Sequence, residues 1–130
     1  MRRNAPFLLC ALLSCPATAG WVVVSHHDEY VAYADAANIE RAGDVARLHD
    51  IIDLKAPRLS PYGVAHRSSQ AHSEFDCTAP RMRTLAFALH AEPMGGGEVV
   101  EAVTPAPGWV PVFGGTLLER LRSFACGQTG

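Results

Sequence analysis

The N-terminal segment decides which part of this 130-residue chain folds and in which compartment it does so. Arg2 and Arg3 precede an apolar run, residues 7–13. That run is too short to cross a bilayer of ~30 Å as a helix, which takes roughly 20 residues. Small residues follow at Ala17 and Ala19, the −3 and −1 positions of a signal-peptidase site. The pattern predicts a secretory signal peptide.

Cleavage between Ala19 and Gly20 would separate a signal peptide, residues 1–19, from a single exported domain, residues 20–130. The loss of two arginines lowers the number of basic residues from 11 to 9, against 13 acidic ones, so the net charge becomes about −4. Lys55 is the only lysine. Because nucleic-acid binding requires clustered cations, we expect no nucleic-acid partner.

Residues 12–15, Leu-Leu-Ser-Cys, resemble a bacterial lipobox, in which the cysteine is lipidated and becomes the mature N-terminus. Leu13 is not a favoured residue at its position, and Pro16 is awkward directly after Cys15. We therefore favour cleavage after Ala19. We expect contact with a membrane only in the alternative case, in which acyl chains on Cys15 anchor the domain.

Two cysteines, Cys77 and Cys126, remain after the predicted cleavage. An even pair in an exported chain predicts a disulfide. Closing a loop of ~50 residues would stabilise the fold by roughly 4 kcal/mol in the chain-entropy model. A metal site or a catalytic thiol are the alternatives, but the two cysteines lie far apart and form no Cys-x-x-Cys motif.

Runs of β-branched and aromatic residues separated by turn residues predict about six strands. Asp35 is expected to cap a short helical turn, and a slip of the alternation at Asp50–Ile51 suggests a β-bulge. Residues 56–63 are predicted to be a loop. The polar segment 64–76 is expected to be an exposed, edge-like strand that ends at Cys77. The predicted strands cover residues 21–24, 30–34, 45–54, 64–76, 81–90 and 98–103.

The last predicted element is a helix that ends at Cys126. Thr116 and Glu119 have the spacing of a capping box. The apolar stripe of this helix consists of Leu117, Leu118, Leu121, Phe124 and Ala125. We therefore expect an α+β fold in which an antiparallel sheet of about six strands packs against a C-terminal helix held by one disulfide.

No motif in the chain predicts catalysis. Residues 26–29, His-His-Asp-Glu, contain potential metal ligands, but neighbouring strand residues point to opposite faces, so we expect an exposed turn. Gly95–Gly97 lacks the following lysine of a phosphate-binding loop and is predicted to be a hairpin turn. We expect no catalytic residue, metal or cofactor. The remaining histidines are scattered without HExxH spacing: His49, His66, His72 and His90.

Taken in order, a set of landmarks resembles the surface-adhesin protein E-like family. Each motif alone is weak, but their order across nearly the whole mature chain is specific. The landmarks are Trp21, Tyr33-Ala34-Asp35 with Ile39 and Gly43, Glu74-Phe75-Asp76-Cys77, Arg81-Met82-Arg83, Met94-Gly95-Gly96-Gly97-Glu98-Val99-Val100, Trp109-Val110-Pro111-Val112 and Cys126.

The resemblance implies an exported domain of a Gram-negative bacterium, in the periplasm or at the cell surface, with a curved sheet and a disulfide-linked helix. Members of the family act as adhesins that bind host or matrix proteins, so the expected function is a non-enzymatic binding module with a protein partner. The alternative is a periplasmic structural or accessory protein that binds another bacterial protein. Exposed edge strands would also allow a homodimer.

Overall fold

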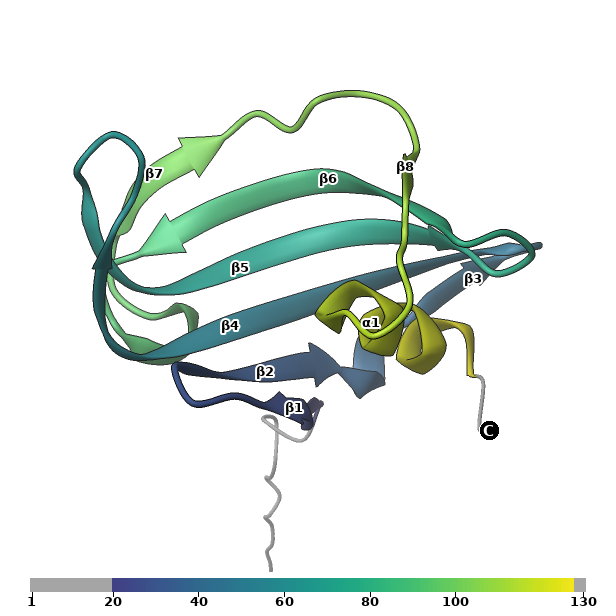
Figure 1. Cartoon of the computed structure of the whole chain (residues 1–130), viewed down its shortest axis with the longest axis horizontal. Helices are drawn as coiled ribbons and strands as arrows, with labels where there is room; N and C mark the ends of the chain where they lie inside the picture. Colours follow the sequence, from purple (N-terminus) through teal and green to yellow (C-terminus); the bar gives the residue numbers. More distant parts are fainter. Residues whose placement is uncertain (1–19, 128–130) are drawn as a thin grey trace, which may run out of the picture.

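The computed structural model describes residues 20–127, which form one antiparallel sheet and an α-helix (Figure 1). The helical segments of this part of the chain are η2 (Ala36–Asn38), η3 (Pro93–Gly95) and α1 (Leu117–Cys126). The strands are β1 (Trp21–His26), β2 (Tyr30–Asp35), β3 (Glu40–Ala42), β4 (Val45–Leu59), β5 (Ala65–Asp76), β6 (Arg81–His90), β7 (Val99–Val103) and β8 (Val110–Pro111).

The strands pair in the order β1-β2-β4-β5-β6-β7, with β3 beside the start of β4 and β8 beside the start of β6. All of these pairs are antiparallel. Most neighbours in the sheet are neighbours in sequence, so short turns set the register of the sheet. The predicted α+β class, the antiparallel sheet and the C-terminal helix are confirmed. The short β3 and β8 add to the six strands of the main order.

Helix α1 lies across one face of the sheet, where it contacts β1, β4 and β5 (Figure 1). We call this side the helix face. Its core combines Leu121 and Ala125 of α1 with sheet residues that alternate toward the helix. Burial of one large apolar side chain stabilises a fold by roughly 1.5–3 kcal/mol. The buried core residues are Ala34, Ala46, Leu48, Phe75, Met82, Val112, Leu121 and Ala125.

The ends of α1 follow the predicted capping. The Thr116 hydroxyl accepts a hydrogen bond from the Glu119 N–H at 3.2 Å. The Glu119 carboxylate accepts one from the Gly115 N–H at 2.8 Å, one residue earlier than in a standard capping box. Gly127 ends the helix with a φ of 70°, a left-handed conformation that glycine adopts without strain. Asp35 caps η2 as predicted, through a bond from the Ala37 N–H.

The opposite side, which we call the distal face, is partly covered by η3. The Met94 N–H donates to Asp53 Oδ1 and the Gly95 N–H donates to Ser68 Oγ, both at 2.8 Å. A side chain at Gly95 would meet Gln70 Oε1 at 3.1 Å, and its φ of 69° also favours glycine. The glycine run therefore does more than turn a hairpin, because it closes one end of the distal face.

This second cover explains why neighbouring residues of β4 are both buried. Asp50 lies on the helix face, and Ile51 lies on the distal face close to Gly95. The pairing of β4 with β2 and β5 stays regular through both residues. The bulge expected at Asp50–Ile51 is therefore wrong. The register shift of β4 falls later, between Asp53 and Arg58.

Two further sequence expectations are corrected. β4 continues to Leu59, so the first half of the predicted loop 56–63 is strand, and residues 60–64 connect β4 to β5. β5 is not an edge strand: it lies between β4 and β6 along its length, and its last residues are buried. The prediction from its polar composition is wrong because Glu74 and Asp76 are buried in ion pairs and Ser68 is buried against η3.

Candidate binding surface

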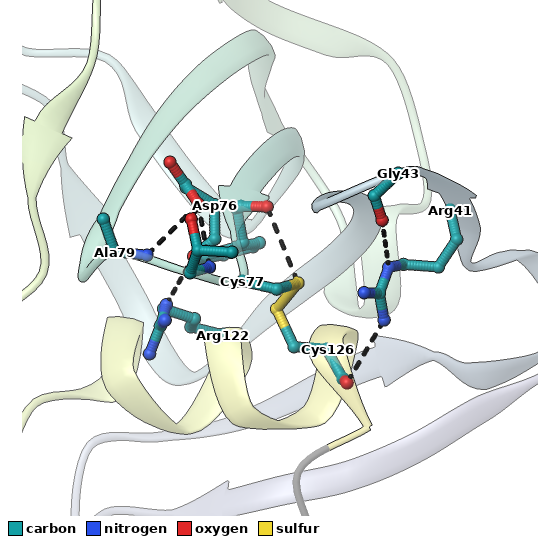
Figure 2. The surroundings of a disulfide bond; sticks show 9 residues. Arg41, Gly43, Asp76, Cys77, Ala79, Arg122 and Cys126 are labelled. Atoms are coloured by element: carbon teal, nitrogen blue, oxygen red, sulfur yellow. Dashed lines mark hydrogen bonds between the residues drawn. A yellow bond between two sulfur atoms is a disulfide. The ribbon is translucent and has the colours of Figure 1, made fainter.

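The predicted disulfide joins Cys77, in the turn after β5, to Cys126, the last residue of α1 (Figure 2). The Cα atoms lie 5.6 Å apart, and the S–S length is 2.05 Å. Two arginines support the same junction: Arg122 Nε donates to the Asp76 carbonyl at 2.7 Å, and an Arg41 Nη donates to the Cys126 carbonyl at 3.3 Å. The helix is therefore fixed to the end of β5 covalently and by hydrogen bonds.

Asp76 organises the turn that brings β5 into β6. Its Oδ1 accepts hydrogen bonds from the Thr78 hydroxyl, the Thr78 N–H and the Ala79 N–H, and Arg81 Nε donates to its Oδ2 at 2.8 Å. These bonds, led by the one from the Thr78 hydroxyl, hold the pKa of Asp76 well below its usual value. The turn thus places Arg81 at the start of β6 on the distal face.

Next to this turn, four charged side chains of alternating sign cross the distal face. The register pairs Glu40 with Arg47, Arg47 with Glu74, and Glu74 with Arg83, so the row runs over β3, β4, β5 and β6. Cross-strand pairs of opposite charge stabilise a sheet. We call this set, Glu40, Arg47, Glu74 and Arg83, the arginine row.

Glu74 is the centre of the arginine row. It is 4% exposed, and its two carboxylate oxygens accept separate bonds, from Arg47 Nε at 2.7 Å and from Arg83 Nε at 2.6 Å. Burial alone would raise the pKa of Glu74, but the bonds from Arg83 and Arg47 outweigh it and lower that pKa. The carboxylate therefore stays ionised, and the two arginines are fixed around it.

Trp109 closes the arginine row on the side of β8. The guanidinium carbons of Arg81 and Arg83 lie 4.7 and 4.4 Å from the centroid of its ring, within cation–π range. The pairing of Val110 with Met82 in β8 and β6 holds the preceding Trp109 in place. Residues from β4, β5, β6 and the segment before β8 thus form one rigid polar surface.

A cleft opens beside the arginine row on the side of β3. It has a volume of ≈ 630 Å³ and is open to solvent. Its lining contains three arginines and two glutamates, but the guanidinium of Arg41 donates to the carbonyls of Gly43 and Cys126 beside the helix. The lining residues are Glu40, Arg41, Ala42, Val45, Arg47, Glu74 and Arg83.

Sequence reasoning did not identify this surface. Arg81-Met82-Arg83, Glu74-Phe75-Asp76 and Trp109 were recognised only as landmarks of a family. A signal was present, because two strands joined by a tight turn carry acidic and basic residues at spacing two. In a hairpin these side chains face each other on one side of the sheet.

The histidines do not gather into a metal site. Within residues 20–127, no group of three or more His, Cys, Asp or Glu side chains could hold a metal ion. In the turn between β1 and β2, His27 stacks on Tyr30, and Glu29 pairs with Arg58 at 2.8 Å. His49 and His72 stack on the distal face with ring centroids 3.9 Å apart, and burial together with His49 lowers the pKa of His72.

The remaining sequence expectations concern the N-terminal segment and contact with a membrane. Cys15 and Ala19 lie outside the described residues, so the predicted lipidation and cleavage sites remain predictions, and Gly20 is the first described residue. In the described part of the chain, no helix combines the length and the apolar character that a membrane span requires.

Comparison with known proteins agrees with this architecture. Residues 21–127 match the family described as surface-adhesin protein E. The structure of Haemophilus influenzae protein E superposes with a TM-score of 0.65 at 15% identity, covering 88% of this chain and 91% of that one. A second crystal form of that protein gives a TM-score of 0.66 at 15% identity, covering 90% and 97%.

Protein E from non-typeable Haemophilus influenzae gives a TM-score of 0.59 at 12% identity, covering 92% of this chain and 83% of that one. Comparison with curated protein sequences gives no significant match. At these identities the solved structures establish a shared fold, and the match over residues 21–127 establishes the family. The chain belongs to the surface-adhesin protein E family.

Proposed function

We propose that this chain is an exported, non-enzymatic binding module of the bacterial envelope whose partner is a protein. The observation that carries the proposal is the match of residues 21–127 to a family of surface adhesins. The arginine row and the adjacent Trp109 support it, because they present charged and aromatic side chains on a rigid sheet without an enclosed cavity. Arginine and tryptophan are enriched among the residues that dominate binding at protein interfaces.

The state of the ionisable groups supports a role other than catalysis. General acid–base catalysis favours a side chain whose pKa lies near the working pH and that can reach a substrate. Bonds from Arg83 and Arg47 lower the pKa of Glu74 despite its burial, and bonds from Thr78 and Arg81 lower that of Asp76. Burial raises the pKa of Asp50 to about 7, but this residue is only 6% exposed on the helix face. Cys77 and Cys126 are joined to each other.

The location follows from the cleavage site that we favour. Cleavage after Ala19 would release the domain into the periplasm, whereas lipidation of Cys15 would tether it for display on the cell surface. The intact mass under non-reducing conditions distinguishes these two products. The alternative function is a periplasmic accessory protein that binds another bacterial protein, and it requires the product cleaved after Ala19. In that case proteolysis of intact cells should leave the chain uncut.

The exposed edge of β1 offers a second arrangement, in which two copies pair as a homodimer. Sedimentation of the purified protein tests this arrangement separately from partner binding. A monomer at all concentrations would remove the homodimer and leave the binding proposal intact.

Partner binding itself is tested with the purified exported protein on immobilised matrix and plasma proteins, and on an extract of the bacterial envelope. We expect saturable binding to a protein in one of these sets. If the purified exported protein binds nothing in either set, the proposed function is contradicted.

A further inference from the structure

The arginines of the distal face share one mode of contact with their carboxylates, in which the donor is Nε. Arg47 and Arg83 each donate from Nε to Glu74, and Arg81 donates from Nε to Asp76. A guanidinium has five N–H donors, so an Nε contact leaves most of them available. The approach of an Arg47 Nη to Glu40 is 4.0 Å, which is too long for a hydrogen bond.

The exposure of these side chains places the remaining donors in solvent. The Glu74 side chain is 5% exposed, whereas those of Arg47 and Arg83 are 49% and 41% exposed. Glu74 therefore lies beneath two guanidinium groups whose outer parts are accessible. Two guanidinium groups flank the Glu74 carboxylate, and the second glutamate of the row, Glu40, lies 4.0 Å from an Arg47 Nη.

The two arginines are also close enough to act on one ligand. They stand on β4 and β6, one strand apart on either side of β5, so their Cα atoms are about 10 Å apart at a strand spacing of ~4.8 Å. Both side chains converge on a single carboxylate, so their guanidinium groups lie nearer to each other than this. Trp109 holds Arg83 from the other side. Such pre-organisation reduces the entropy lost on binding.

We propose that the outward Nη groups of Arg47 and Arg83 bind a carboxylate of an acidic protein segment, which lies in the cleft beside β3. The planar fork of arginine matches a carboxylate. This inference rests on the proposed function, because it names the chemistry of the protein partner.

The distribution of charge favours a protein carboxylate over a sulfated polysaccharide. A polyanion binds through many separate cation contacts along its length. Here Arg47 and Arg83 stand beside two glutamates in the cleft lining, and the predicted exported domain carries about four more negative than positive charges. The surface suits one or two carboxylates and repels a long chain of sulfates.

The test uses the purified exported protein and three probes: N-acetyl-tetraglutamate amide, the matching tetraglutamine, and a heparin tetrasaccharide. NMR follows the arginine Nε–H signals and, for variants that lack them, the backbone amide signals of β4, β5 and β6 during each titration. We expect tetraglutamate to shift the signals of Arg47 and Arg83 with a dissociation constant of about 1 mM, while tetraglutamine leaves them unchanged.

The matched variants keep the positive charge but replace the planar guanidinium group with an ammonium group. Arg47→Lys with Arg83→Lys leaves each lysine able to contact Glu74, so the fold should be retained, which amide spectra check. We expect this double variant to bind tetraglutamate at least ten-fold more weakly. Arg58→Lys is the control, because Arg58 pairs with Glu29 of the β1–β2 turn, away from the cleft. This variant should bind tetraglutamate as the parent does.

Several results would overturn the inference: no shift with tetraglutamate, equal shifts with tetraglutamine, equal affinity of the folded double variant, or preference for the heparin tetrasaccharide. Repeating the protein panel with the double variant separates this inference from the proposed function. Unchanged partner binding would reject the arginine site alone. Arginine-dependent tetraglutamate binding without any protein partner would reject the proposed function and leave the anion site.

Discussion

Asp50 and Glu74 are carboxylic acids of neighbouring strands, both almost fully buried, yet they lie on opposite faces of the sheet and behave in opposite ways. Glu74, on the distal face, has an arginine on each oxygen, and its pKa is lowered. Asp50, on the helix face, has alanines opposite it on both sides, at Ala34 and Ala71. Burial therefore raises the pKa of Asp50 to about 7.

The difference shows that burial alone does not determine the charge of an acid in this sheet. The helix face is built from apolar side chains, so a carboxyl group there gains most by holding its proton. The distal face supplies two fixed guanidinium groups, so its carboxyl group is ionised and organises the surface. One face provides stability, and the other carries the polar chemistry available to a partner.

Removing both cations from Glu74 is the strongest test of the contrast between Asp50 and Glu74. Arg47→Ala with Arg83→Ala leaves a buried carboxylate without a partner, and we expect a loss of about 4–5 kcal/mol in the free energy of unfolding at pH 7.5, measured by urea denaturation. Adding Glu74→Gln should restore much of this loss. Arg58→Ala, in an exposed pair, should change stability by less than about 1 kcal/mol. A similarly small effect of the double variant would contradict the assigned role of Glu74.

Cutting the covalent link of the helix face is the next largest change. Cys77→Ser with Cys126→Ser should lower the free energy of unfolding by about 4 kcal/mol, because the unfolded chain regains the freedom of a loop of ~50 residues. Urea denaturation measures the loss, and the reduced parent protein is the control. We expect the folded variant to keep its tetraglutamate affinity. A loss of that affinity would show that the two faces are not independent.

The pH dependence of the free energy of unfolding tests the same contrast between Asp50 and Glu74. Asp50 has a folded pKa of about 7 and a reference value of 3.8, so well below pH 3.8 it is protonated in both the folded and the unfolded state. As pH rises from 3.8 to about 7, the unfolded state ionises first, and stability is lost until a plateau above pH 7. Asp50→Asn should therefore gain about 3–4 kcal/mol over the parent at pH 8 and little at pH 4, because one pKa unit corresponds to about 1.4 kcal/mol.

Urea denaturation between pH 4 and pH 8 measures this effect. Asp28→Asn, in the exposed turn between β1 and β2, is the matched control. Glu74→Gln should show the opposite slope, because a group with a lowered folded pKa stabilises above its unfolded value and loses this effect on acidification. Parallel slopes for the variants of Asp50 and Glu74 would refute the contrast between the two faces.

The smallest expected effect concerns Trp109. Trp109→Leu removes two cation–π contacts, from Arg81 and Arg83, and should lower the free energy of unfolding by about 1 kcal/mol. The same variant should weaken tetraglutamate binding about three-fold, because Arg83 becomes more mobile. The NMR titration measures this change, with Trp21→Leu as the control. Unchanged binding would mean that Glu74 alone fixes Arg83.

Much of the fold could be predicted from local signals in the sequence. The caps at Asp35 and Thr116, the strand at residues 81–90 and the pairing of Cys77 with Cys126 depend on short patterns or on simple counting. The central position of β5 could not be predicted in this way. Its serines, glutamate and aspartate have the composition of an exposed strand, and only the neighbouring strands bury them.

The binding surface was harder to predict for the same reason. Arg47 and Arg83 are 36 positions apart in the chain, and they meet at Glu74 only because β4, β5 and β6 adopt one particular register. The sequence contains the charges but does not state which strands are neighbours. The buried state of Asp50 likewise depends on the packing of the helix face, which no local pattern specifies.

The position of the disulfide has a mechanical consequence. It closes a covalent loop that contains β6, β7, β8 and α1, so a force that pulls residues 20 and 127 apart bypasses this loop. The 49 positions between Cys77 and Cys126 cannot lengthen, which withholds about 170 Å of extension at ~3.5 Å per residue. Under tension the strands from β1 to β5 would therefore yield first, and Arg83 and Trp109 would remain within the unbroken loop.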